Sequence, residues 1–229
     1  MSIIGSNLQV VRARIDAAAR AADRDPGDIA LLAVSKTFTQ DAVRAAYEAG
    51  QREFGENYVQ EAIGKIASLS DLPLVWHFIG PIQSNKTRAI AENFDWVHSV
   101  EREKIALRLA ESRSAERDPL NICLQVNVSG EASKSGVAPE GVRALAEAVR
   151  ALPRLRLRGL MAIPEPSGDI ALQRLRCAGL RQLLAQLNEE DFGLDTLSMG
   201  MSQDLESAVT EGATIVRIGT AIFGERKRA

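Results

Sequence analysis

The chain has 229 residues, of which 45% are hydrophobic and 25% charged, and its formal net charge is -2. This length suits one large α/β domain, and this charge gives no electrostatic reason to expect a nucleic acid or an anionic membrane as a partner. The two cysteines, Cys123 and Cys177, form neither a disulfide framework nor a metal-ligand spacing, and there is no secretory signal or run of about 18 apolar residues. We therefore expect a cytoplasmic protein without a metal site.

The first elements of the chain predict a helix followed by a buried strand. Apolar residues recur at helical spacing over 6–22, before a stop signal at Asp25-Pro26-Gly27. An apolar run then begins at Ile29 and ends on Lys36, which is typical of a parallel strand buried on both faces. Because ligands bind at the carboxyl ends of such strands, Lys36 is either a functional amine that forms a Schiff base or a lysine that extends into solvent.

The rest of the chain alternates between the two patterns. We expect strands over 52–56, 74–79, 96–97, 120–128, 155–163, 194–199 and 214–218, and helices over 39–50, 58–69, 85–92, 101–112, 139–152, 172–187 and 202–211. Eight βα units with short loops predict one domain over residues 1–229, a closed (β/α)8 TIM barrel. The alternative is a doubly wound open sheet, but Ser35-Lys36-Thr37 stands where its glycine fingerprint would follow the first strand.

In such a barrel, polar residues that follow the strands share one rim. The segment 198–202 joins a strand to a helix, with Ser202 as the expected N-cap and Asp204 in the first turn, so backbone amides would face the rim. Together with Gly219 and Thr220 it predicts a phosphate site, although an ordinary turn and helix cap would explain the same residues. The rim residues are Lys36, Glu56, Asn57, His77, Asn127, Met161, Ser198, Arg217, Gly219 and Thr220.

A reactive lysine and a phosphate site on one rim fit a phosphorylated aldehyde such as pyridoxal 5'-phosphate. Arg217 would then face the pyridine nitrogen and keep it unprotonated, which weakens the ring as an electron sink. Its alternative role is a structural ion pair at the barrel mouth. For His77 we expect a satisfied buried hydrogen bond rather than a role as a base.

Motifs spread over nearly the whole chain resemble those of the pyridoxal phosphate homeostasis proteins, the YggS/PROSC family. These motifs are Leu32-Ala33-Val34-Ser35-Lys36, Phe54-Gly55-Glu56-Asn57-Tyr58-Val59-Gln60-Glu61, Trp76-His77-Phe78-Ile79-Gly80, Gln83-Ser84-Asn85-Lys86, Ser133-Lys134-Ser135-Gly136, Arg158-Gly159-Leu160-Met161, Leu197-Ser198-Met199-Gly200-Met201-Ser202 and Val216-Arg217-Ile218-Gly219-Thr220. The resemblance implies a barrel like the N-terminal domain of alanine racemase.

The same resemblance implies pyridoxal 5'-phosphate bound covalently to Lys36, with Arg217 at the pyridine nitrogen. Lys134 is implied only as a secondary lysine. The other cofactor-binding residues implied are Asn57 and His77 near the ring, and Ser198, Met199, Gly200, Ser202, Gly219 and Thr220 around the phosphate.

The resemblance further implies a monomeric, non-catalytic protein that stores, buffers or delivers pyridoxal 5'-phosphate, with apo-enzymes that use this cofactor as recipients. The alternative is an amino-acid racemase of low activity, which needs a second acid/base, usually a tyrosine from a separate β domain. The chain ends at Ala229 soon after the last expected strand, and its tyrosines, Tyr47 and Tyr58, fall on or beside helices. We therefore expect no catalytic residue. For a regulatory module that docks on such enzymes, the sequence offers no exposed apolar stripe.

Overall fold

The computed structural model describes residues 2–130 and 135–225, so Lys134 lies outside the described residues. Eight parallel strands close into a barrel in sequence order, and β8 pairs with β1. The predicted TIM barrel is therefore confirmed, and the open doubly wound sheet is wrong. The strands are β1 (Ala30–Val34), β2 (Glu53–Glu56), β3 (Val75–Phe78), β4 (Trp96–Val100), β5 (Leu120–Gln125), β6 (Leu155–Met161), β7 (Thr196–Ser198) and β8 (Ile215–Ile218).

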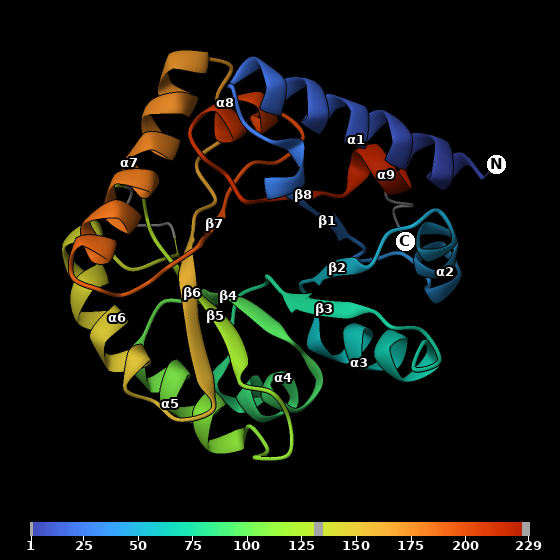
Figure 1. Cartoon of the computed structure of the whole chain (residues 1–229). Coiled ribbons are helices and arrows are strands. Elements are labelled where there is room, and N and C mark those ends of the chain that lie inside the picture. Colours follow the sequence, from blue (N-terminus) through green and yellow to red (C-terminus); the bar gives the residue numbers. More distant parts are fainter. Residues whose placement is uncertain (1, 131–134, 226–229) are drawn as a thin grey trace.

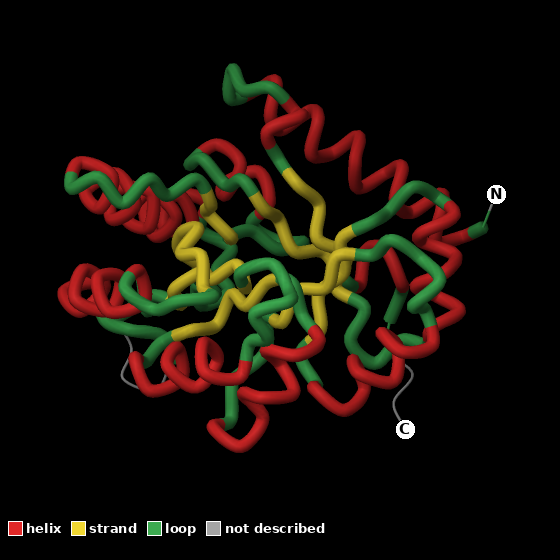
Figure 2. The backbone as a smooth tube through the Cα atoms, turned by 60° about the horizontal axis from the view of Figure 1, so that its bottom comes forward, coloured by secondary structure: helices red, strands yellow, loops and turns green. Residues whose placement is uncertain are grey.

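Helices surround the barrel, as Figures 1 and 2 show. They are α1 (Ile3–Ala21), α2 (Gln40–Glu48), α3 (Val59–Ser68), α4 (Thr87–Asn93), α5 (Glu103–Ser112), α6 (Val142–Arg150), α7 (Ile170–Glu189), α8 (Leu205–Thr210) and α9 (Thr220–Phe223), with 3-10 turns η1 (Pro26–Asp28), η2 (Ser84–Lys86) and η3 (Pro139–Gly141). The first helix, α1, packs against α2, α8 and α9. No helix in the described part of the chain is both long and apolar enough to cross a membrane.

Several element boundaries differ from the sequence prediction, and the start of α1 and the end of β4 have clear local reasons. Helix α1 begins at Ile3 because the side chain of Ser2 caps it, accepting a hydrogen bond of 3.0 Å from the amide of Gly5. Strand β4 extends to Val100, beyond the predicted 96–97, through the polar pair His98 and Ser99. These polar residues interrupt the apolar run, but both are buried and hydrogen-bonded, so the strand continues.

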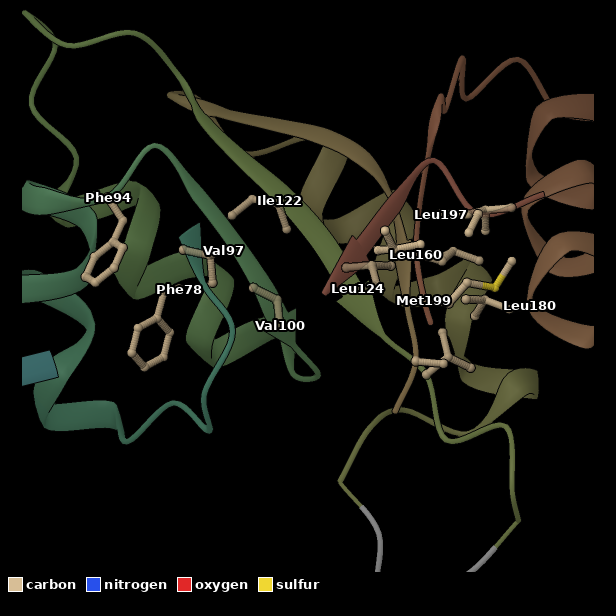
Figure 3. Packing of buried hydrophobic residues seen from close by; sticks show 14 of the residues in the cluster. Phe78, Phe94, Val97, Val100, Ile122, Leu124, Leu160, Leu180, Leu197 and Met199 are labelled. Carbon is tan, nitrogen blue, oxygen red and sulfur yellow. The ribbon is translucent and has the colours of Figure 1, made fainter. Parts of the chain in front are cut away.

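The main hydrophobic core fills the space between the strands and the helices. Figure 3 shows part of it, with Leu197 and Met199 close to Leu180 of α7, and these residues are at most 5% exposed. A second, smaller cluster joins Leu32, Val34, Ile79 and Ile215. Because Ile215 and Arg217 are two residues apart on β8, their side chains lie on the same face of the strand. The small cluster therefore lies on the face that carries the arginine.

Candidate functional site

A cavity of about 310 Å³ opens at the carboxyl ends of the strands. Its volume is in the range of small-molecule sites, which start at roughly 300 Å³. Six of the predicted site residues line it, namely Lys36, Asn57, Ser202, Arg217, Gly219 and Thr220. The remaining described residues of its wall are Val34, Phe38, Ile79, Ile163, Pro164, Glu165, Pro166, Ser167, Gln173, Met201, Gln203 and Asp204.

Lys36 follows β1 and is half-buried at the cavity wall. The backbone on both sides of it is held by neighbouring side chains. Before it, the carbonyl oxygen of Ser35 accepts a hydrogen bond of 2.7 Å from Nζ of Lys65. After it, the amide of Thr37 donates one of 2.6 Å to Oε1 of Glu61. Thr37 has a φ of 68°, in the left-handed region that β-branched residues rarely adopt, so these contacts hold a turn that the sequence does not favour locally.

The cluster behind Lys36 is a buried ion pair. Nζ of Lys65 lies 2.7 Å from Oε1 of Glu56 and 2.6 Å from Oε1 of Glu61, and Lys65 and Glu56 are both buried. The hydroxyl of Ser35 also donates to Glu56, over 2.7 Å. Burial raises the pKa of Glu56, an effect that the Lys65 ammonium and the Ser35 hydroxyl oppose. Glu56, which the sequence places on the rim, is therefore a support of the Lys36 segment rather than part of the cavity wall.

Arg217 presents a buried positive charge to the cavity. It is 4% exposed, and its guanidinium donates to Oγ of Ser198 and to the carbonyl oxygen of Ala162, each over 2.7 Å. Burial lowers its pKa to about 10, so it stays protonated at neutral pH. None of the ion pairs among the described residues involves it, which leaves the predicted structural ion pair without support. A buried cation held only by neutral groups favours an electron-rich ligand.

The loops after β7 and β8 complete the cavity, but not in the way that the sequence predicted. Helix α8 begins at Leu205, so Asp204 occupies the N-cap position and Ser202 lies in the preceding turn. The carboxylate of Asp204 accepts a hydrogen bond of 2.7 Å from the amide of Met201. The prediction of Ser202 as N-cap is wrong, because the turn that closes on Asp204 moves the N-cap two residues along the chain.

Glycines let these loops approach the barrel closely. Gly200 has a φ of 94°, and a Cβ atom there would lie 2.7 Å from Cβ of Ala208. A Cβ atom on Gly219 would lie 3.1 Å from the carbonyl oxygen of Val34, beside Lys36. Larger residues would push both loops outwards, so these glycines set the dimensions of the cavity.

Four predicted site residues, His77, Ser198, Met199 and Gly200, do not line the cavity. All four are buried, and Met199 belongs to the hydrophobic core. Ser198 contacts Arg217 from behind, and His77 lies 2.9 Å from His98 through their ring nitrogens. Of the other rim residues, Met161 is fully buried and Asn127 is half-buried, and neither is in the wall.

Sequence reasoning missed His98 and the segment 163–167 that forms one wall. Alternation from Trp96 would have placed His98 and Val100 on the same strand face, had the strand been extended through its polar residues. The wall segment carries no such signal, because Pro164-Glu165-Pro166 reads only as the end of a strand.

The residues present fit a phosphorylated aldehyde with an aromatic ring. Lys36 supplies an amine, Arg217 a buried donor for a ring nitrogen, and close-packed glycine loops a place for a phosphate. Oδ1 of Asn57 is buried in the wall and accepts no hydrogen bond from any described residue, so a ligand donor would satisfy it. Among the described residues, no group of three histidine, cysteine or acidic side chains is placed to hold a metal ion.

Comparison with known proteins first defines the class. Residues 6–227 match the family model of the alanine racemase N-terminal domain. Alanine racemase from Corynebacterium glutamicum superposes with a TM-score of 0.70 over 99% of this chain and 62% of that chain. At 17% identity this likeness is one of fold. The barrel and its rim therefore define a protein of the alanine racemase N-terminal type.

Closer relatives narrow the class. A Pseudomonas aeruginosa protein named pyridoxal phosphate homeostasis protein is 67% identical over 226 residues, covering 99% of this chain and 97% of its own length. PipY of Synechococcus elongatus, whose structure was solved with PLP bound, is 40% identical with a TM-score of 0.85, over 96% of this chain and 100% of that chain. The chain belongs to the family of pyridoxal phosphate homeostasis proteins.

Proposed function

We propose that this protein binds pyridoxal 5'-phosphate and serves its homeostasis in the cell by storing, buffering or delivering it. One observation carries the proposal: the amine-bearing Lys36 and the buried cation of Arg217 line the same cavity. The names of its relatives and the PLP-bound PipY structure support the same function.

The proposed attachment is covalent, through Lys36. Its Nζ adds to the aldehyde carbon of the cofactor, and a C=N bond forms with loss of one water. Arg217 would donate to the pyridine nitrogen, Asn57 would accept from the ring substituents, and Ser202, Gly219 and Thr220 would hold the phosphate. His77, Ser198, Met199 and Gly200 would act from behind the wall, by supporting the residues that touch the cofactor.

We further propose that the protein is not an enzyme. A racemase of this barrel type needs a second acid/base beside the lysine, usually a tyrosine. The described residues of the wall include no tyrosine, histidine or cysteine. Tyr47 lies under the guanidinium of Arg52, with 4.0 Å from ring centroid to Cζ, and Tyr58 is 52% exposed outside the wall. This supports a binder over the racemase alternative.

We propose one domain over residues 1–229, a monomer in solution, and apo-enzymes that use pyridoxal 5'-phosphate as recipients. A cytoplasmic location is supported by Cys123 and Cys177, which are both free thiols buried in the fold. Light scattering tests the monomer, since a dimer would double the measured mass.

A transfer experiment tests the function directly. The loaded protein is incubated with an apo-enzyme that needs pyridoxal 5'-phosphate, and separately with L- and D-alanine, and recovered activity and enantiomer exchange are measured. We expect the apo-enzyme to gain activity and the amino acids to keep their configuration. Racemisation faster than roughly 1 per second, an ordinary enzyme rate, would contradict the proposal.

A further inference from the structure

A chain of buried hydrogen bonds leads from Arg217 across the interior of the barrel. Oγ of Ser198, which accepts from Arg217, lies 2.8 Å from Nδ1 of His98, and Nε2 of His98 lies 2.9 Å from Nδ1 of His77. Strands β4 and β7 are not neighbours in the barrel, so the contact between His98 and Ser198 crosses its interior. Ser198, His98 and His77 are each at most 1% exposed.

The donor character of arginine sets the direction of this chain. A guanidinium can only donate, so Oγ of Ser198 accepts from Arg217, and its single proton is left for His98. Nδ1 of His98 is then an acceptor, and its ring proton sits on Nε2, from which it donates to His77. His77 in turn accepts at Nδ1 and carries its proton on Nε2. That atom lies 3.6 Å from Oε2 of Glu53, at the amino end of β2, which is beyond hydrogen-bond distance, and it has no hydrogen-bond partner among the described residues.

The opposite direction is disfavoured at both ends. If His98 donated to Ser198, the serine oxygen would accept from two donors, and no third partner of its hydroxyl is present among the described residues. The unprotonated Nε2 of His77 would then face the oxygen of Glu53. A charged histidine is disfavoured as well, since burial lowers the pKa of His77 to about 3 and also lowers that of His98, where the charge of Arg217 adds to the effect.

We propose that His98 is a positioning residue for Arg217. It holds the hydroxyl of Ser198, which accepts from Arg217, and His77 holds His98 in turn by accepting a hydrogen bond from its Nε2. The proposal rests on the proposed function, in which Arg217 faces the ring nitrogen of bound pyridoxal 5'-phosphate. Because every partner in the chain is neutral, the arginine is held in place without losing its positive charge. A carboxylate partner would orient the same group but would cancel the charge that the ring meets.

The direction of the chain can be tested without the cofactor. The sequence contains two histidines, so a ¹⁵N spectrum of the imidazole nitrogens contains signals from His77 and His98 alone. At neutral pH we expect both rings to be neutral and protonated on Nε2, in the cofactor-free and the loaded protein. A proton on Nδ1 of His98, or a charged ring, would overturn the proposal.

The positioning role is tested by a matched pair of variants, His98→Asn and His98→Leu. The two side chains have similar shapes, but only asparagine keeps an acceptor where Nδ1 of His98 lies. We expect His98→Leu to weaken the binding of pyridoxal 5'-phosphate by about tenfold and to shift the absorption band of the bound cofactor. His98→Asn should stay within about threefold of wild type and keep the band.

Val97→Ala is the control, because it removes buried volume beside His98 without removing any of the hydrogen-bonding side chains that connect Arg217 to His77. It should lower the melting temperature and leave the band unchanged. Equal affinities of His98→Asn and His98→Leu for the cofactor would overturn the positioning role. If His98→Leu folds poorly, the ¹⁵N spectrum of the wild type still tests the direction of the hydrogen bonds. Failure of the wild type to bind the cofactor would instead contradict the proposed function.

Discussion

Nζ of Lys65 lies 2.7 Å from the carbonyl oxygen of Ser35, the residue that precedes Lys36. Through this contact a buried ion pair, rather than strand pairing alone, holds the backbone from which the side chain of Lys36 extends. The rigid support lies on the side away from the cavity. An amine that must meet an aldehyde in one geometry benefits from such a fixed base.

Removing Lys65 should therefore destabilise the protein strongly. In Lys65→Met, Glu56 would stay buried without its cation, and we expect a loss of about 3 kcal/mol in the free energy of unfolding, measured with urea. The double variant Lys65→Met/Glu56→Leu should recover much of this loss. As a control, Arg88→Met removes an exposed pair with Glu92 and should leave stability unchanged. Wild-type stability in Lys65→Met would mean that Glu56 is not ionised.

Arg217 should behave differently, because its hydrogen-bond partners, the hydroxyl of Ser198 and the carbonyl oxygen of Ala162, are neutral. We expect Arg217→Met to lose less stability than Lys65→Met in the cofactor-free protein, but to bind pyridoxal 5'-phosphate at least about tenfold more weakly. Titration followed by absorbance gives the affinity, and urea unfolding of the same samples gives the stability. A variant that is strongly destabilised yet binds normally would show that the arginine is structural.

Stability should fall on acidification below about pH 6.5. The folded state depresses the pKa of His77 to about 3 and also lowers that of His98, so the stability they contribute is complete above the ordinary histidine pKa near 6.5 and is lost as pH falls below it. Each histidine should contribute a slope of up to about 1.4 kcal/mol per pH unit. The raised pKa values of Glu53 and Glu56 act in the opposite direction.

Comparison with His77→Asn between pH 5 and 6.5 separates these effects. Asparagine at this position keeps an acceptor for His98 but does not titrate, so the free energy of unfolding should depend less steeply on pH than in wild type. Equal slopes in the two proteins would mean that His77 is already protonated in the folded state.

Substitution of Gly200 should damage both the fold and the cavity. Gly200→Ala combines a φ of 94° with a Cβ contact of 2.7 Å to Ala208, so we expect a loss of about 3 kcal/mol and weaker cofactor binding as the loop with Ser202 moves. Gly193→Ala is the matched control, since its φ is 65° but nothing lies within 4 Å of the added Cβ. It should cost about 1 kcal/mol and leave binding unchanged. Equal effects of both would show that backbone strain alone is responsible.

The barrel, and the position of Lys36 in the cavity wall, could be predicted from the sequence. Apolar runs alternate regularly with helical periodicity, and the first run ends on the lysine. The sequence could not show which residues near a strand end line the cavity and which lie buried behind its wall. Ser198 and Met199 are adjacent, yet one contacts Arg217 and the other packs in the outer core, since successive side chains point to opposite faces. His98 was missed because the predicted strand stopped at its polar residues, and because one of its partners, Ser198, comes from a strand distant in the sequence.

The proposed covalent link to Lys36 is tested most directly by locating the cofactor on the chain. The loaded wild-type protein is reduced with borohydride, digested and analysed by peptide mass spectrometry, with an unreduced sample as control. We predict one stoichiometric pyridoxyl modification, on Lys36. Modification of another lysine in place of Lys36, or release of all cofactor after reduction, would contradict the account.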